Sequence, residues 1–155
     1  MGNAFMARAI QLSIENVRSG HGGPFGAVVV QGSSIVGEGV NQVTSTNDPT
    51  AHAEVLAIRQ ACQKLRRFEL KGCELYTSCE PCPMCLGAIY WARLSRVYFA
   101  NVAADASKIG FDDSAIYREV AQPYAQRWIP MIQMMREEAL AAFRAWEDKP
   151  NKVGY

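Results

Sequence analysis

The sequence predicts an α/β fold, a three-layer α/β/α sandwich in which helices cover both faces of a five-stranded mixed sheet. The first observation is size, because 155 residues with 49% hydrophobic positions are enough for one domain with a sizeable core. The second is a hairpin pattern, with apolar runs at residues 27–30 and 35–40 joined by a polar turn. The third is the later alternation of helical periodicity with short apolar strands, which is typical of helices packed on both faces of a sheet.

The first part of the chain predicts a helix, the hairpin and a second helix. An amphipathic pattern at residues 4–17 predicts the first helix, which Asn3 can cap and Gly20 can end. The hairpin follows, and its first strand is apolar on both faces, as in a buried strand. A polar loop at residues 41–50 then leads into the second helix, at about residues 51–65.

The rest of the chain predicts three more strands and three more helices. They are strands at about residues 75–77, 96–100 and 129–134 and helices at about residues 83–93, 114–120 and 136–146. The helix at residues 83–93 is apolar on more than one face, so it is either deeply buried or shared with another subunit. A homodimer satisfies both conditions. We assign residues 1–148 to a single domain and residues 149–155 to a C-terminal tail.

Composition argues against several classes of protein. The formal net charge of +1 gives no electrostatic footprint for nucleic acid, so we expect no nucleic-acid partner. No segment approaches the roughly 18 consecutive apolar residues of a membrane span, and a signal-peptide pattern is missing, so we expect a soluble cytoplasmic protein. Five cysteines in such a protein indicate metal ligands or buried thiols rather than disulfides.

Three residues have the types found in a catalytic zinc site. His52, Cys82 and Cys85 supply one imidazole and two sulfurs, which leaves a fourth position for water. Helical periodicity begins just after His52 and just after Cys82, so both are expected at helix N-termini. Pro83 suits a first helical position, where no amide hydrogen is needed. The positive helix ends favour thiolates and a deprotonated water on the metal.

Glu54 is the carboxylate that this ligand set does not need. We expect it to take a proton from the water and return it to a ring nitrogen and to the departing amine of a substrate. Residues two apart on a regular helix point in nearly opposite directions, so this role requires His52 to lie in an irregular first turn.

Several residues keep two interpretations. Cys79 and Cys82 also form a C-x-x-C pair, so a redox pair or a shifted ligand set stays open, although Cys82 and Cys85 belong to the start of one helix. Asn41 carries the donor and the acceptor that recognition of a base edge requires, but it can equally stabilise a turn. Phe25 can stack on a planar ligand or pack in the core.

His-Ala-Glu at residues 52–54 followed by Pro-Cys-x-x-Cys at residues 81–85 resembles the signature of the cytidine-deaminase-like zinc deaminases. Within that superfamily, the chain is similar to the short bacterial guanine deaminases. The likeness covers nearly the whole chain, in segments 22–28, 47–54, 76–93 and 110–114 and at Tyr155. The zinc motif specifies only the superfamily, whereas Phe-Asp-Asp at residues 111–113 and the terminal tyrosine point to guanine.

The resemblance implies zinc-dependent hydrolysis of guanine to xanthine and ammonia, in purine catabolism or salvage. One Zn²⁺ per subunit would be held by His52, Cys82 and Cys85. Water activated by the zinc would attack C2 of guanine, and Glu54 would protonate the neighbouring ring nitrogen and then the leaving amine. The residues that the resemblance implies for guanine binding are Asn41, Phe25, Ala53, Trp91, Asp113 and Tyr155. Members of the group form dimers with exchanged C-terminal segments, so Tyr155 is expected to cap its own site or that of a partner subunit.

Two other functions stay open. The tRNA-specific adenosine deaminases share the zinc site, but they would normally want a basic surface for the phosphate backbone, and the near-neutral charge counts against this. A non-catalytic, zinc-stabilised interaction domain is the other alternative. Glu54 beside an incomplete ligand set argues against it, because a purely structural site needs neither feature.

Overall fold

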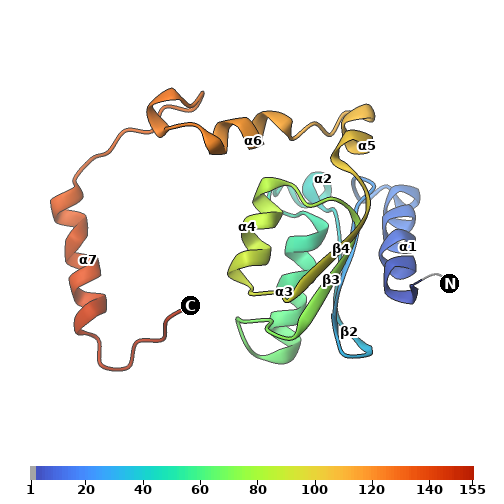
Figure 1. The fold of residues 1–155 in the computed structure, drawn as a ribbon, viewed down its shortest axis with the longest axis horizontal. Coiled ribbons are helices and arrows are strands. Elements are labelled where there is room, and N and C mark those ends of the chain that lie inside the picture. Colours follow the sequence, from blue (N-terminus) through green and yellow to red (C-terminus); the bar gives the residue numbers. More distant parts are fainter. Residues whose placement is uncertain (1–2) are drawn as a thin grey trace. The chain divides into compact units, whose positions relative to one another are not determined.

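The computed structural model describes residues 3–155, which cluster into two compact units. The first unit ends at Asp113, and the second is Ser114–Tyr155. Of the described residues, only those of the first unit form strands (Figure 1).

The first unit contains a four-stranded mixed sheet with the strand order β2-β1-β3-β4. Strand β1 pairs antiparallel with both β2 and β3, whereas β3 and β4 are parallel. The elements of this unit are α1 (Ala4–Ser19), β1 (Gly26–Gln31), β2 (Ser34–Val40), α2 (Val43–Thr46), α3 (Ala53–Leu65), β3 (Cys73–Cys79), α4 (Pro83–Trp91), β4 (Arg96–Asn101) and α5 (Ala103–Lys108).

Helices cover both faces of this sheet: α1 lies on one face, and α3 and α4 lie on the other (Figure 1). Side chains alternate along β1, so Ala27 and Val29 belong to the core beneath α3, whereas Val28 and Val30 belong to the core beneath α1. A strand buried on both sides is what the apolar run in the sequence predicts. The α/β fold and a mixed sheet with helices on both faces are confirmed.

The prediction of a fifth strand at residues 129–134 is wrong, because the sheet of the described residues has four strands. The segment carries the expected apolar side chains, but Ile129 is 79% exposed and Ile132 is 81% exposed. A strand needs a neighbouring strand for its backbone N–H and C=O groups, and the described residues of the second unit contain none. Apolar spacing alone does not supply that neighbour.

The ends of α1 agree with the local signals in the sequence. The side chain of Asn3 accepts hydrogen bonds from the backbone N–H groups of Phe5 and Met6. Gly20 ends the helix with a φ of 73°, a left-handed conformation that favours a residue without a Cβ atom.

The second unit is helical and has no core of its own. Its elements are α6 (Ser114–Ala121), a short 3₁₀ helix at Tyr124–Gln126 and α7 (Arg136–Asp148). None of its residues is buried in the chain. The division of the chain at residue 148 into a domain and a tail stays a prediction. None of the helices in residues 3–155 combines the length and the apolar character that crossing a membrane requires.

Two glycines on β2 let α3 lie directly against the sheet. A Cβ atom at Gly39 would overlap the carbonyl oxygen of Ala53, and one at Gly37 would overlap the carbonyl oxygen of Ala57. The backbone of the helix therefore rests on the backbone of the strand, and this contact fixes where the first turn of α3 lies.

We predict that Gly39→Ala lowers the free energy of unfolding by about 1–3 kcal/mol or more, because the new methyl group meets helix backbone that cannot turn away. The midpoint of urea unfolding measures this change. Gly87→Ala is the matched control, since no atom lies within 4 Å of the added methyl in α4. A Gly39→Ala variant as stable as the control would show that α3 can move away from β2.

Candidate metal centre

His52 and Cys82 both lie immediately before a helix. His52 is the N-cap of α3, with φ −76° and ψ 152°, and Cys82 is the N-cap of α4, with φ −68° and ψ 169°. Pro83 occupies the start of α4, and Cys85 follows in its first turn. The extended backbone at His52 is the irregular first turn that a shared role of His52 and Glu54 requires.

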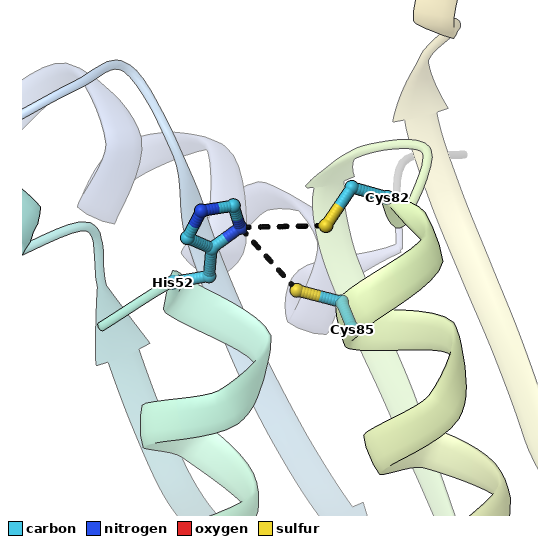
Figure 2. A group of neighbouring side chains, drawn as sticks. All are labelled: His52, Cys82 and Cys85. Atoms are coloured by element: carbon cyan, nitrogen blue, oxygen red, sulfur yellow. Dashed lines mark hydrogen bonds between the residues drawn. The ribbon is translucent and has the colours of Figure 1, made fainter. Parts of the chain in front are cut away.

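The three predicted ligand atoms converge on one point. The Sγ atoms of Cys82 and Cys85 each lie 3.5 Å from Nδ1 of His52 (Figure 2). All three atoms lie within 4.8 Å of one another. Tetrahedral zinc, with bonds of about 2.0 Å to nitrogen and 2.3 Å to sulfur, places nitrogen and sulfur ligands about 3.5 Å apart. These residues therefore fit a zinc ion with one further position open.

The electrostatics of the cluster favour a cation. A hydrogen bond with Cys85 lowers the pKa of Cys82 to about 4, and the hydrogen bond with His52 adds to this effect while burial opposes it. The hydrogen bond with Cys82, together with burial, raises the pKa of Cys85 far above its usual value. The hydrogen bond with Cys82 also raises the pKa of His52. These shifts favour the thiolate form of Cys82, and a metal ion that binds both sulfurs would displace the thiol proton of Cys85.

Glu54 lies in the first turn of α3 and is only 6% exposed. The Cys85 thiol donates to its Oε2 at 3.5 Å, so the carboxylate borders the ligand cluster. Burial raises the pKa of Glu54, and this outweighs the hydrogen bond from its own backbone, which lowers the pKa. A buried carboxyl group with a raised pKa next to a metal site is suited to accept a proton and return it.

Cys79 is outside the cluster, which in the described part of the chain consists of His52, Cys82 and Cys85. The Cys79 thiol is 5% exposed and donates to the carbonyl of Val102 at 3.9 Å. Burial raises its pKa to about 11, so it is a protonated, packed thiol. This geometry favours the ligand pair Cys82 and Cys85 over the C-x-x-C alternative.

Asn41 follows the end of β2 and is 6% exposed. Its Oδ1 accepts hydrogen bonds from the backbone N–H groups of Gly23 and Val43, both at 3.3 Å. The turn-stabilising interpretation is therefore observed. Both bonds use the oxygen, so the Nδ2 amino group is the donor that Asn41 can offer to a ligand.

The remaining candidates occupy different places. Ala53 is fully buried as the first residue of α3, and Asp113 is the last residue of the first unit. Burial and the nearby Cys82 raise the pKa of Asp113. Trp91 ends α4, roughly 12 Å along the helix axis from its start, and is outside the ligand cluster. Tyr155 is the last residue of the second unit, and its role stays a prediction.

Phe25 packs against the core beneath α3 and also against Phe111, with ring centroids 5.0 Å apart at an interplanar angle of 89°. The structure thus supports the core-packing interpretation, and a ligand contact stays a prediction. Phe111 was not recognised as a pocket candidate, because only the three-dimensional fold brings the two rings together.

Asn16 and Ser78 are buried polar residues of the same region that the sequence patterns do not single out. Asn16 is 4% exposed and donates hydrogen bonds to two loop carbonyl groups, and the Oγ of Ser78 accepts one from the backbone N–H of Gly26 at 3.0 Å. The place of Asn16 on the inner face of α1 does follow from the sequence, since Asn16 lies seven residues after Ala9, which is on the apolar side of the helical pattern.

A His-Cys-Cys ligand set on two helix N-termini, with a buried carboxylate beside it and a mixed α/β sheet beneath, defines a zinc-dependent hydrolytic deaminase. The chain belongs to the cytidine and deoxycytidylate deaminase family, whose zinc-binding-region model matches residues 2–101.

Comparison with individual relatives separates two groups within this family. Guanine deaminase of Bacillus subtilis (strain 168) is 54% identical over 151 residues, which cover 97% of this chain and 97% of that protein. The X-ray structure of guanine deaminase from Bacillus subtilis has a TM-score of 0.96 at 53% identity, covering 100% of this chain and 99% of that one. The tRNA-specific adenosine deaminase of Aquifex aeolicus (strain VF5) is 46% identical over 77 residues, or 50% of this chain and 51% of that protein.

We predict that Cys82→Ser and Cys85→Ser proteins lose their zinc, from about one ion per chain to nearly none, because a three-ligand site does not hold the ion with two ligands. Mass spectrometry of metal content measures this. Cys79→Ser is the control and is expected to keep its zinc, since its thiol lies outside the cluster. Zinc retained in Cys85→Ser but lost in Cys79→Ser would identify the other pair as ligands.

Proposed function

We infer that the chain is a guanine deaminase, a zinc-dependent enzyme that hydrolyses guanine to xanthine and ammonia. The observation that carries this inference is the 54% identity with guanine deaminase of Bacillus subtilis across 97% of both chains. The similarity to tRNA-specific adenosine deaminase of Aquifex aeolicus covers only half of the chain. The zinc-binding region at residues 2–101 is a property of the whole family, whereas the likeness over nearly the whole chain supports guanine as the substrate.

Zinc, when bound, lowers the pKa of a coordinated water to about 7 and so supplies hydroxide at neutral pH. The residues of the chain manage the protons of this reaction. Glu54 accepts the first proton of the attacking water and donates it to the ring nitrogen beside C2. It then transfers the second proton, from the new hydroxyl group on C2, to the leaving amine. A C2–O bond forms, the C2–N bond breaks, and ammonia leaves. The burial of Glu54 and its contact with the Cys85 thiol support this role.

The base is held by groups that border the metal cluster. We assign the Nδ2 of Asn41 as a donor to an acceptor on the purine edge, because its Oδ1 is already bonded to backbone amides. Ala53 contributes its backbone N–H, since the first-turn amides of a helix have no partner within the helix. Asp113 accepts from an N–H group of the base, and Phe25 walls the pocket with Phe111.

The active form is a homodimer in which the second units are exchanged. A helical segment without a buried residue is stable only when its apolar side chains are covered. The exposed apolar side chains that support this proposal include Ile116, Val120, Trp128, Ile129, Ile132, Met134 and Phe143. In this arrangement Tyr155 of one chain closes over the guanine in the site of the other chain, and Trp91 contributes at that same pocket. The five cysteines of the chain are free thiols, which supports a cytoplasmic location.

We predict that Glu54→Gln lowers kcat for guanine by roughly 10²–10⁴-fold, because the amide cannot carry the proton. Ammonia release measures the rate, and the zinc content is expected to stay near one ion per chain. The substrate panel is guanine, guanosine, adenine, cytosine, cytidine and a tRNA anticodon stem-loop. Inosine formation in the RNA without ammonia from guanine would make the protein a tRNA adenosine deaminase.

We predict a particle of twice the 17.1 kDa chain mass in light scattering, and recovery of the wild-type KM in a mixed dimer of two defective chains. Tyr155→Ala alone is expected to raise the KM for guanine roughly tenfold through loss of the aromatic contact. A purified heterodimer of Glu54→Gln and Tyr155→Ala chains regains one complete site if the tails are exchanged. If each tail closes its own site, the heterodimer keeps the raised KM of Tyr155→Ala, because no site combines Glu54 with Tyr155.

A further inference from the structure

We propose that Asn16, on α1, is a positioning residue that holds Asn41 and the turn before β1 in the conformation that binds guanine. Asn16 is not part of the metal cluster. The inference rests on the proposed function, because it concerns how that same site holds its base.

One amino group on Asn16 bridges two separate loops. The Nδ2 atom donates to the carbonyl of Gly23 at 2.9 Å and to the carbonyl of Asn41 at 2.8 Å. A side-chain amide has two hydrogens on its nitrogen, so both donors are used. Gly23 belongs to the turn before β1, and Asn41 follows β2, so a single side chain links the two segments beside Phe25.

The two linked segments also contact each other directly. The backbone N–H of Gly23 donates to Oδ1 of Asn41 at 3.3 Å, and the backbone N–H of Asn41 donates to the carbonyl of Phe25 at 3.1 Å. A Cβ atom at Gly22 would overlap the carbonyl oxygen of Asn41. The turn and Asn41 therefore form one packed group, which Asn16 holds from α1.

This group determines which way the amide of Asn41 faces. Backbone N–H groups of Gly23 and Val43 hold its oxygen, which leaves the amino group to meet a purine acceptor. Asn16 holds the backbone of the same residue through its carbonyl. The Asn41 residue is thus held at its backbone carbonyl, by Asn16 of α1, and at its side-chain oxygen, by Gly23 and Val43. These two sets of bonds fix the direction in which its Nδ2 donates.

The burial of Asn16 indicates that its side chain is there for its hydrogen bonds. It is 4% exposed on the inner face of an amphipathic helix, where an apolar residue is the ordinary occupant. A buried amide is unfavourable unless its donors are satisfied, and here both are spent on the segments that carry Asn41 and Phe25. Removing the amide leaves two loop carbonyls without their donor, and the loops then move toward other partners.

The test compares Asn16→Ala with Ser13→Ala. Ser13 is also buried on α1, but its Oγ donates to the carbonyl of Ile10 within the same helix. We expect Asn16→Ala to raise the KM for guanine about tenfold or more, with kcat within a few-fold of wild type and full zinc content. Ser13→Ala is expected to keep the wild-type KM. A purely structural role would lower the melting temperature and leave KM unchanged.

A double-mutant cycle shows whether Asn16 acts through Asn41. In an Asn41→Ala background, adding Asn16→Ala is expected to change KM by much less than it does in the wild type, because the positioned donor is already gone. If the fold-changes in KM from the two single substitutions multiply in the double variant, the two residues act independently and the inference is wrong.

Asn16→Ser retains one hydroxyl donor, and it replaces Asn16→Ala in the KM measurement if Asn16→Ala folds poorly. Its expected KM lies between those of wild type and Asn16→Ala. If both variants lose zinc and helical circular dichroism, Asn16 has a structural role only and the inference is wrong. Wild-type protein that releases no ammonia from guanine would overturn the proposed function itself, and the inference with it. Guanine turnover with an unchanged KM in Asn16→Ala would overturn the inference alone.

Discussion

The metal centre depends on two helices that begin at the same end of the sheet. The ligands of α4 come directly after the carboxyl end of β3, because Cys79 closes that strand and Cys82 caps the helix. His52, at the start of α3, is positioned by the close backbone contact of that helix with Gly37 and Gly39 of β2. Open α/β sheets bind ligands beyond the carboxyl ends of their strands, and here the rule follows from these two contacts.

The two helix starts bring several groups that can carry negative charge close together, and a cation would compensate that charge. Glu54 is almost fully buried with the Cys85 sulfur 3.5 Å from its Oε2, and the lowered pKa of Cys82 favours a thiolate nearby. Buried anionic groups of like sign are unfavourable unless positive charge compensates them. Two helix N-termini supply part of that charge, and a divalent ion supplies the rest. A metal ion at this cluster would therefore stabilise the Glu54 carboxylate and the sulfur ligands together.

The parts of the fold that were predictable depend on nearby residues. Asn3, Gly20 and Pro83 mark helix ends through local geometry, and the zinc ligands follow helix starts that periodicity reveals. The strand predicted at residues 129–134 failed because pairing requires a neighbour that periodicity does not encode. Asn16 was missed for a related reason, since its partners lie 7 and 25 residues along the chain and only the folded hairpin brings them together.

The candidate hydrolytic residues and some of the candidate base-binding residues lie in different parts of the chain. The family model ends at residue 101, after the metal ligands and Glu54, whereas Phe111, Asp113 and the second unit lie beyond it. Guanine deaminase of Bacillus subtilis matches 97% of this chain and the tRNA-specific adenosine deaminase of Aquifex aeolicus matches 50%, so these two relatives differ in how much of the chain they match. Water activated by zinc can attack any suitable ring carbon that lies beside it. The groups that orient the base therefore decide which substrate reacts. Asn41 lies inside residues 2–101, and it is bonded both to Asn16 of α1, through its carbonyl, and to Gly23 of the turn before β1, through its Oδ1. Specificity for a purine can thus differ between relatives while every residue that touches the metal is unchanged.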